Sequence, residues 1–397
     1  MQRALLPLLA LIAATFACAE PLELADWRIE VPPGTRIIEL PSVPLEERDA
    51  DAVRLVDDLV LGGDDTDMEA LFYRPVDIVA AANGRMFVAD SGDRRVLMFA
   101  ADGTYLGSFG REGQGPGEFS SIVSMAIAGD RIVIKDNRNN RLSVWTVDGE
   151  HVADHPSRSF RVLLRMEGMG DDAFVAWFID EAGDGGPRLV VARHALDGSE
   201  LTRLFDEPLP PPMVIRDGQS TTRELVQRSI EVLDYPEVHT AAGGADIAYL
   251  SPIHEYQVLA VSADGSPRWA LRVAWPRPPL AESTKAALVE QRSRSGTGTA
   301  TVGDFDWPPA SALQLLRTDG AGRLYVFPTM PREDDEPPAP RMVDVYSPTG
   351  ELLAAGLVDH IWTHARGDYV YGLRTNERDE RVAVRYRLTV NHPEAGR

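Results

Sequence analysis

Histidine is the first residue type to consider for chemistry in this 397-residue chain, because its imidazole is a common ligand of zinc and other divalent metals. The eight histidines are scattered, and His254-Glu255 lacks the second histidine that a zinc-binding helix needs. His360 and His364 fall in or beside one predicted inner strand, and His239 is a third candidate. These three are the metal-site candidates, although histidines that pack or face solvent are the favoured interpretation.

A run of acidic residues between Asp64 and Glu69 offers the hard oxygen ligands that calcium prefers. It lacks the glycine and the downstream glutamate of a helix-loop-helix calcium site, so a solvated turn is the favoured interpretation. Glu333–Glu336, which lies between prolines, is expected to be an extended, exposed loop. A divalent cation, calcium or zinc, is the cofactor class that these patterns and the histidines suggest.

The glycine-rich segment Gly110–Gly117 superficially resembles a phosphate-binding loop. Such a loop must open a helix whose N-terminus faces the phosphate. Here the segment follows a predicted strand and leads to another strand, so we interpret it as a connection between repeats. The chain also lacks a Walker lysine and a nucleophile-elbow serine. No motif therefore predicts a reaction.

A sequence repeat identifies the elements that must position any site. Asp90, Arg95 and Gly103 recur as Asp136, Arg141 and Gly149, each 46 residues later. A period of this length, with short apolar runs and a turn dipeptide in each unit, is typical of a propeller blade. Asp-Gly or a similar pair, which is a hairpin signal, recurs at Asp102-Gly103, Asp148-Gly149, Asp197-Gly198, Asp264-Gly265 and Thr349-Gly350.

A second series of six turns lies about 18 residues before these and implies six units. The predicted fold is an all-β, six-bladed β-propeller of four-stranded blades, a to d, with one short helical insertion. The sixth unit lacks its outer strand, which we expect Arg54–Leu61 to supply, closing the ring and protecting its edges. Trp27–Val31 and Arg36–Leu40 are candidates to add to or replace that strand. The predicted domains are a leader at 1–19, an N-terminal segment at 20–74 and the propeller at 75–390.

The repeated aspartate and arginine invite a functional interpretation, but a structural one is favoured. Asp90 ends strand b and Arg95 opens strand c, so the two are predicted to pair across the b–c loop. A catalytic residue needs to occur once, whereas a structural fastening is useful in every blade.

At FVADSGDRRV (Phe87–Val96) and at Gly107–Phe119, the chain resembles the NHL-repeat β-propellers, and most of all the exported bacterial six-bladed group. The resemblance is specific from about Arg74 to Val152 and looser afterwards. It implies a six-bladed ring with a central funnel. It does not imply one function, because such propellers include binding scaffolds, lyases that hold a metal in the channel, and lactone hydrolases.

The distribution of loop lengths suggests a working face. The b–c and d–a links emerge on one face, here called the long-loop face, and they include insertions at 206–236 and 276–310. Long loops on a rigid scaffold commonly carry binding or catalysis. A helix predicted at Leu280–Arg292 is either a lid or a decoration on the rim. The candidate ligand-binding residues on this face are Asp90, Asp136, Asp180, His254, Arg332 and His360.

Composition limits the partners and the compartment. A net charge of −21 argues against nucleic acid and against anionic lipid. Residues 1–19 resemble an export signal, with Arg3, an apolar run and Ala17-Cys18-Ala19 as a cleavage site. The chain is therefore expected to be periplasmic or secreted, with a lipoprotein anchored through Cys18 as the alternative, and with no transmembrane span after cleavage. We expect a binding module for a protein or for a small cationic or polyhydroxylated ligand. The alternative is a lyase or hydrolase with a metal in the funnel.

Overall fold

The structure is a computed structural model, and it describes eleven segments of the chain. These are residues 29–62, 68–157, 162–180, 186–208, 221–223, 225–226, 238–243, 246–252, 254–294, 298–330 and 340–391. The predicted leader at 1–19, most of the acidic run at 64–69, Arg332 and the Glu333–Glu336 loop lie outside these segments.

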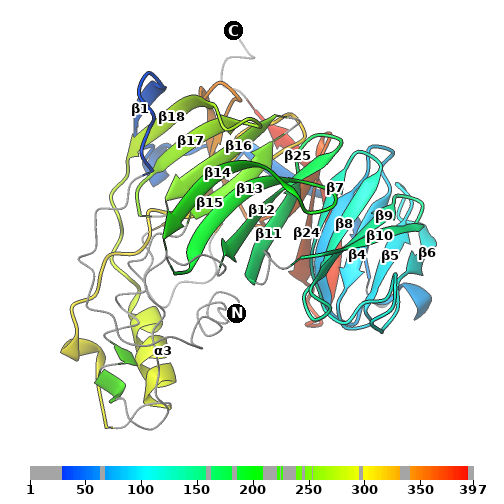
Figure 1. Cartoon of the computed structure of the whole chain (residues 1–397). Coiled ribbons are helices and arrows are strands. Elements are labelled where there is room, and N and C mark those ends of the chain that lie inside the picture. Colours follow the sequence, from blue (N-terminus) through cyan, green and yellow to red (C-terminus); the bar gives the residue numbers. More distant parts are fainter. Residues whose placement is uncertain are drawn as a thin grey trace.

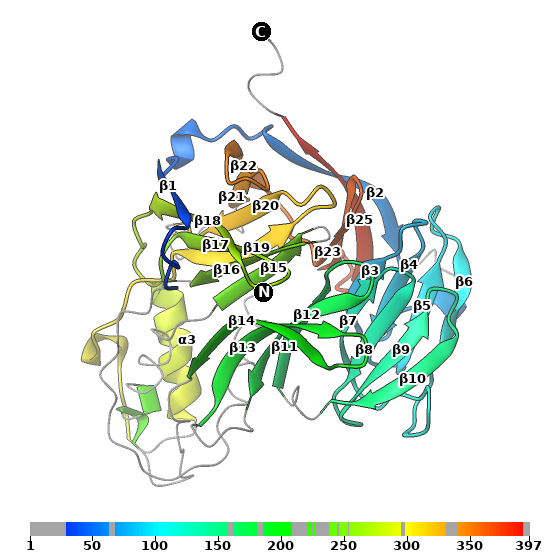
Figure 2. The same cartoon turned by 45° about the horizontal axis from the view of Figure 1, so that its top comes forward.

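Six sheets form a ring, as predicted, and each contains one four-stranded antiparallel blade (Figures 1 and 2). Blade 1 comprises β3 (Pro75–Ala80), β4 (Met86–Asp90), β5 (Arg95–Phe99) and β6 (Tyr105–Phe109). Blade 2 comprises β7 (Ile122–Ala128), β8 (Arg131–Asp136), β9 (Arg141–Thr146) and β10 (His151–Pro156). Blade 3 comprises β11 (Val162–Gly168), β12 (Ala173–Asp180), β13 (Arg188–Ala195) and β14 (Glu200–Pro208).

The remaining three blades follow the same order from inner to outer strand. Blade 4 comprises β15 (Val238–Gly243), β16 (Ile247–Pro252), β17 (Gln257–Ser262) and β18 (Pro267–Ala274). Blade 5 comprises β19 (Leu313–Thr318), β20 (Leu324–Pro328), β21 (Arg341–Tyr346) and β22 (Leu352–Val358). Blade 6 comprises β23 (His364–Arg366), β24 (Tyr369–Thr375), β25 (Arg381–Val390) and the N-terminal β2 (Val53–Leu61).

The glycines of the predicted c–d turns have the backbone conformation that these hairpins require. Their φ angles lie between 83° and 90°, where a side chain would be strained. They are Gly103, Gly149, Gly198, Gly265 and Gly350. The repeated turn dipeptide therefore sets the blade register from local sequence alone.

The predicted closing strand is confirmed. β2 pairs antiparallel with β25 from Val53 opposite Val390 to Leu61 opposite Ala383. Of the other two candidates, Arg36–Leu40 forms β1 (Arg36–Pro41), which instead pairs parallel with β18 and adds a fifth strand to blade 4. Trp27–Val31 lies partly outside the described segments. Because β2 comes from the opposite end of the chain, closure joins the two termini of the propeller and covers the free edge of blade 6.

A buried ion pair fastens the N-terminal segment to blade 5. Arg48 follows the short helix η1 (Leu45–Glu47), and its side chain donates to Asp344 at 2.6 Å and to the carbonyl of Val343 at 3.2 Å. Asp344 also accepts the hydroxyl of Tyr256 at 2.7 Å. The segment between β1 and β2 is therefore anchored to the ring by a charged group with several partners.

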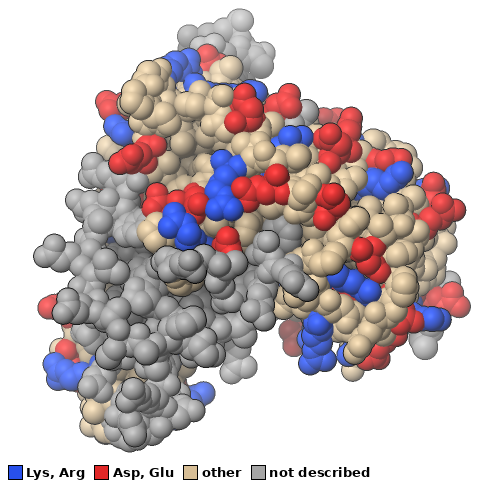
Figure 3. Space-filling model, in the orientation of Figure 1, with Lys and Arg blue, Asp and Glu red and all other residues tan. Residues whose placement is uncertain are grey.

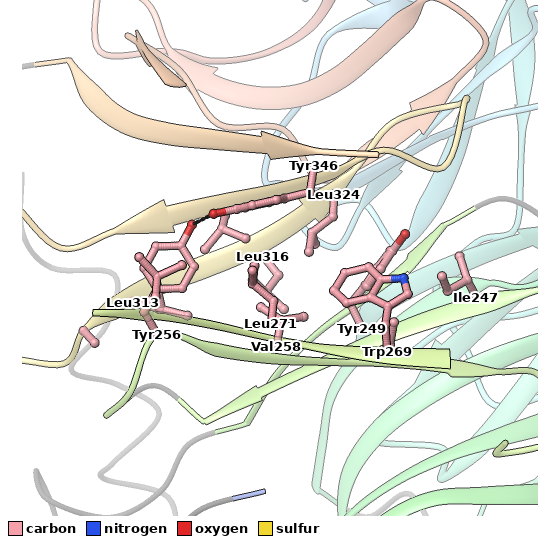
Figure 4. Close-up of a cluster of buried hydrophobic side chains, with 14 residues drawn as sticks. Ile247, Tyr249, Tyr256, Val258, Trp269, Leu271, Leu313, Leu316, Leu324 and Tyr346 are labelled. Atoms are coloured by element: carbon pink, nitrogen blue, oxygen red, sulfur yellow. Dashed lines mark hydrogen bonds between the residues drawn. The ribbon is translucent and has the colours of Figure 1, made fainter. Parts of the chain in front are cut away.

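The hydrophobic core lies mainly between neighbouring blades. Figure 4 shows the cluster between blades 4 and 5, where Tyr249 and Trp269 of blade 4 lie near Leu316 and Leu324 of blade 5. Tyr256 and Tyr346 meet across this interface through their hydroxyls at 2.9 Å. Packing of this kind holds each blade through its neighbours, so the ring has no single central core.

The predicted helix is present as α3 (Glu282–Ser293). It packs with the short helix η4 (Val302–Asp304) and with residues 221–226 of the other long insertion. Its buried Leu288 and Val289 contact Val226, and the Thr222 hydroxyl donates to the carbonyl of Gly298 at 2.9 Å. We call the described parts of 221–226 and 279–309 the insertion lobe. Figures 1 and 2 show α3 to one side of the ring, which favours a decoration on the rim over a lid.

Candidate functional site

Asp90 and Asp136 were predicted to face a ligand, but the structure assigns them a structural role. Both side chains are fully buried at the ends of β4 and β8. Asp90 accepts the backbone amides of Tyr73 and Arg74 at 2.6 and 2.7 Å. Asp136 accepts the amides of Ser120 and Ser121 at 3.0 and 2.9 Å. Because backbone amides occupy these carboxylates, they position the chain that enters the inner strand of their own blade.

The predicted ion pairs between these aspartates and Arg95 or Arg141 are not formed. Arg95 donates to the carbonyls of Glu69 and Leu71 at 3.1 and 3.2 Å and pairs with Asp93. Arg141 donates to the carbonyls of Gln114, Gly115 and Glu118, and it pairs with Asp154 at 3.1 Å. Both arginines therefore hold the chain that enters their blade. The predicted structural role is present, but the arginines bind mainly backbone carbonyls.

Three of the other four predicted ligand-binding residues lie in different parts of the ring. Asp180 ends β12 opposite Arg188, and His254 lies in the b–c link of blade 4, 3.4 Å from Arg277. The ring of His360 stacks on Tyr386 at 5.6 Å. Asp180 and His254 thus belong to blades 3 and 4, His360 lies in the link between blades 5 and 6, and Arg332 lies outside the described segments.

The metal candidates also differ in their surroundings. His364 lies on β23, where its Nε2 is 3.3 Å from the carbonyl of Ala80, and burial lowers the pKa of its imidazole to about 4. His360 stacks on a tyrosine, as described above, and His239 lies on β15, whose side chains are outside the description. Within the described segments, no three histidine, cysteine, aspartate or glutamate side chains gather as metal ligands do.

A polar cavity lies instead in the central channel, lined by inner strands of four blades. Its volume is about 150 Å³. Polar side chains come from β3, β7, β11 and the start of blade 6, and apolar ones such as Val79, Val123 and Met166 lie among them. The polar residues are Asp77, Ser124, Arg165, Glu167, Thr363 and His364.

Asp77 is the carboxylate on the blade 1 side of this cavity. Its Oδ1 accepts the amide of Ile78 at 2.9 Å, and its Oδ2 accepts the amide of Met125 at 2.8 Å. The Ser124 hydroxyl lies 3.4 Å from Oδ2. Burial raises the pKa of the Asp77 carboxyl to about 6, because these hydrogen bonds only partly replace the lost water.

Arg165 forms the opposite wall, on blade 3. It donates to Glu167 at 2.5 Å and to the carbonyl of Thr363 in blade 6 at 2.5 Å. Arg317 lies on β19 of blade 5, where burial, and next the repulsion of Arg165, lowers the pKa of its guanidinium to about 9. Its Nη1 donates to its neighbour Leu316 at 2.7 Å, and its Nε donates to the carbonyl of Trp362. Arginines thus brace the channel wall by bonding carbonyls at the start of blade 6, from blade 3 across the channel and from the neighbouring blade 5.

Sequence reasoning missed this cavity, apart from His364. Its polar residues form no motif, because each blade contributes only one or two of them. One signal was available: Asp77 and Ser124 occupy equivalent places in units one and two, and Arg165 and Glu167 precede the turn at Gly170-Asp171. A charged or polar residue within an inner strand is a pointer to the channel.

On the face drawn in Figure 3, acidic and basic side chains lie side by side over the described residues. Neither sign of charge forms a single large patch there. Ion pairs such as Arg203 with Glu200 at 2.8 Å and with Asp206 at 2.7 Å account for part of this mixing. The net charge of −21 is therefore not concentrated there.

Comparison with known proteins supports the fold. The DUF5128 family, described as a 6-bladed beta-propeller, matches residues 65–157, which include blades 1 and 2. The match bears out the six-bladed propeller, and the resemblance to NHL repeats stays a prediction. No curated protein sequence matches this chain.

Solved structures with similar folds share little sequence with this chain. A protein named as exported, from Bacteroides fragilis, has 11% identity and a TM-score of 0.47, with 89% of this chain and 99% of that chain covered. A DUF4221 family member from Bacteroides vulgatus has 11% identity and a TM-score of 0.45, with coverages of 86% and 100%. Virginiamycin B lyase from Staphylococcus aureus has 9% identity and a TM-score of 0.39, with coverages of 84% and 99%. Among the described residues, no helix has the length and apolar character needed to cross a bilayer.

Proposed function

We propose that this protein is an exported binding protein that holds a small ligand in its central channel, reached from the long-loop face. The observation that carries the proposal is the polar cavity at the meeting point of blades 1, 2, 3 and 6. Concave sites with a few convergent polar groups among apolar ones are where small ligands bind.

The exposure of the lining residues supports entry from the long-loop face. Strand a of each blade begins on that face and ends at a short a–b turn. Val123, near the beginning of β7, is 39% exposed, whereas Ala126, nearer the turn, is 1% exposed. On blade 2, the lining is thus more exposed toward the long loops than toward the short turn.

A ligand screen against a cavity-blocking variant tests the binding role. Small amines, acids, sugars and metal salts would be added to the purified protein and the melting temperature measured. We expect at least one class to raise it, and Val123→Trp to abolish that rise by filling the entrance. Val152→Trp is the matched control, because Val152 is an exposed valine (49%) on the outer strand of the same blade. A rise that survives Val123→Trp would place the site elsewhere.

Export is tested separately by cell fractionation of the full chain and of a chain lacking residues 1–19. We expect only the full chain to leave the cytoplasm, because its leader has the charge and apolar pattern of a signal. Cys18→Ser separates the two routes, since it would release the protein from membranes only if Cys18 were the anchor. Equal distribution of both chains would contradict export.

A further inference from the structure

We propose that the channel cavity accepts a small primary ammonium ion, whose positive charge binds the carboxylate of Asp77. This inference rests on the proposed function and names the chemical class of the ligand. It follows from the pairing of the charged groups in the cavity, from the remaining hydrogen-bond capacity of Asp77, and from the size and lining of the space.

The charges in the cavity are unevenly paired. Arg165 is engaged by Glu167 at 2.5 Å, so these two charges largely offset each other. His364 is neutral near pH 7, because its pKa lies at about 4. Asp77 is mostly ionised at that pH, and it makes no ion pair within 4 Å with any described residue. Arg165 and Arg317 act on Asp77 only as charges at longer range. The carboxylate at the cavity therefore has no contacting counter-ion, and a ligand that supplies one would be a cation.

Asp77 retains room for one more donor. A carboxylate has about four acceptor positions, and those of Asp77 are used by the amides of Ile78 and Met125 and, weakly, by the Ser124 hydroxyl. An ammonium N–H can take the remaining position and form a charge-assisted hydrogen bond. The amides also hold the carboxylate in place, so the site is preorganised.

The space and its lining restrict the ligand further. A cavity of about 150 Å³ is comparable to one that holds a benzene-sized molecule. The apolar lining, including Val76, Val79 and Leu164, suits a short alkyl chain. No phenylalanine, tyrosine or tryptophan is among the lining residues in the described part of the chain. A quaternary ammonium, which proteins usually bind on aromatic faces, is therefore disfavoured.

Isothermal titration with four size-matched probes tests the proposal: n-propylamine, propionate, tetramethylammonium and β-alanine. At pH 7.5 we expect propylamine to bind the wild-type protein, and propionate and tetramethylammonium to give no measurable heat. Asp77→Asn should weaken propylamine binding by about tenfold or more, since it removes the charge and keeps the shape. Asp93→Asn, at a half-exposed aspartate in the b–c loop of the same blade, should leave binding unchanged.

Several outcomes would overturn the inference. The first is an unchanged affinity for propylamine in Asp77→Asn, and the second is binding of propionate. The third is β-alanine binding ten times more tightly than propylamine, which would indicate a zwitterion site that uses Arg165. If Asp77→Asn fails to fold, Val123→Trp must abolish the propylamine signal instead. If no amine binds but another compound gives a shift that Val123→Trp removes, this inference fails while the proposed binding function stands. If nothing binds, both fail.

Discussion

Asp90 and Arg95 lie directly opposite each other in the ladder between β4 and β5, yet their side chains bind different parts of the chain that enters blade 1. Asp90 accepts the amides at 73 and 74, while Arg95 donates to the carbonyls at 69 and 71. Asp136 and Arg141 repeat the arrangement in blade 2. The repeated pair therefore binds one connecting segment at two places. The aspartate binds its amides and the arginine binds its carbonyls.

Removing either aspartate should destabilise the ring. Asp90→Ala or Asp136→Ala leaves two or more buried amides without an acceptor, so we expect the free energy of unfolding to fall by about 3 kcal/mol. Chemical denaturation monitored by circular dichroism measures this. Asp93→Ala, on the surface of the same loop, is the control and should change stability by less than about 0.5 kcal/mol. A ligand affinity lost from folded Asp90→Ala protein, with unchanged stability, would show that the aspartate belongs to a site.

Two truncations separate the closing strand from the added fifth strand. A chain beginning at residue 43 loses β1 but keeps Arg48 and β2, so we expect a soluble monomer with a lower melting temperature. A chain beginning at residue 63 also loses β2 and exposes the edge of β25, so we expect aggregation or unfolding. Size-exclusion chromatography distinguishes them. A stable monomer from the shorter chain would mean that closure does not depend on β2.

Excision of residues 280–308, the larger part of the insertion lobe, should leave the ring folded. The amide of Ala310 donates to the carbonyl of Pro278 at 2.8 Å, so the two ends of the insertion already meet and can be joined by two glycines after removal of residues 280–308. The lobe has its own small hydrophobic cluster, apart from the cores between the blades. We expect near-native circular dichroism, with altered ligand binding if the lobe shapes the entrance. Loss of the folded β signal would make the lobe part of the core.

Acid sensitivity should depend on His364. The pKa of its imidazole is about 4 in the folded protein, compared with 6.5 for an ordinary histidine. As the pH falls, the unfolded chain therefore takes up a proton at this histidine before the folded protein does. The stability that the neutral His364 contributes is complete above pH 6.5 and is lost as the pH falls toward 4. His364→Asn should flatten this part of the pH–stability curve. His194, which is buried in blade 3 with a pKa also lowered to about 4, is a matched comparison away from the cavity.

The ionisation of Asp77 should change the stability of the protein in the opposite direction to that of His364, over nearly the same pH range. Its pKa is raised to about 6, so the folded protein binds a proton more readily than the unfolded chain. Its stabilising contribution is complete below about pH 3.8 and is lost as the pH rises through 6. We expect Asp77→Asn to increase stability at pH 7 relative to the wild type, measured as the difference between their thermal denaturation curves. A decrease at pH 7 would indicate that the charged carboxylate is needed by the fold.

Local sequence determined most of the architecture. The Asp-Gly turns, the 46-residue period and the alternating strands predicted six blades, and the missing outer strand of the last unit predicted closure by 54–61. These inferences succeeded because hairpins depend on residues close together in the chain, and because an open sheet edge must be covered. The helix at 282–293 was predicted for the same reason, since a helix is a local pattern.

The candidate site depended on the tertiary structure. Asp77, Arg165 and Thr363 are far apart in the sequence and meet only because the ring brings the inner strands of different blades to one axis. The partners of Asp90 and Arg95 could not be predicted either, because backbone amides and carbonyls of a connecting segment carry no sequence signal. Which carboxylate faces the cavity and which one is used by the backbone is decided by how the connections between blades pack, and no periodicity in the chain encodes that packing.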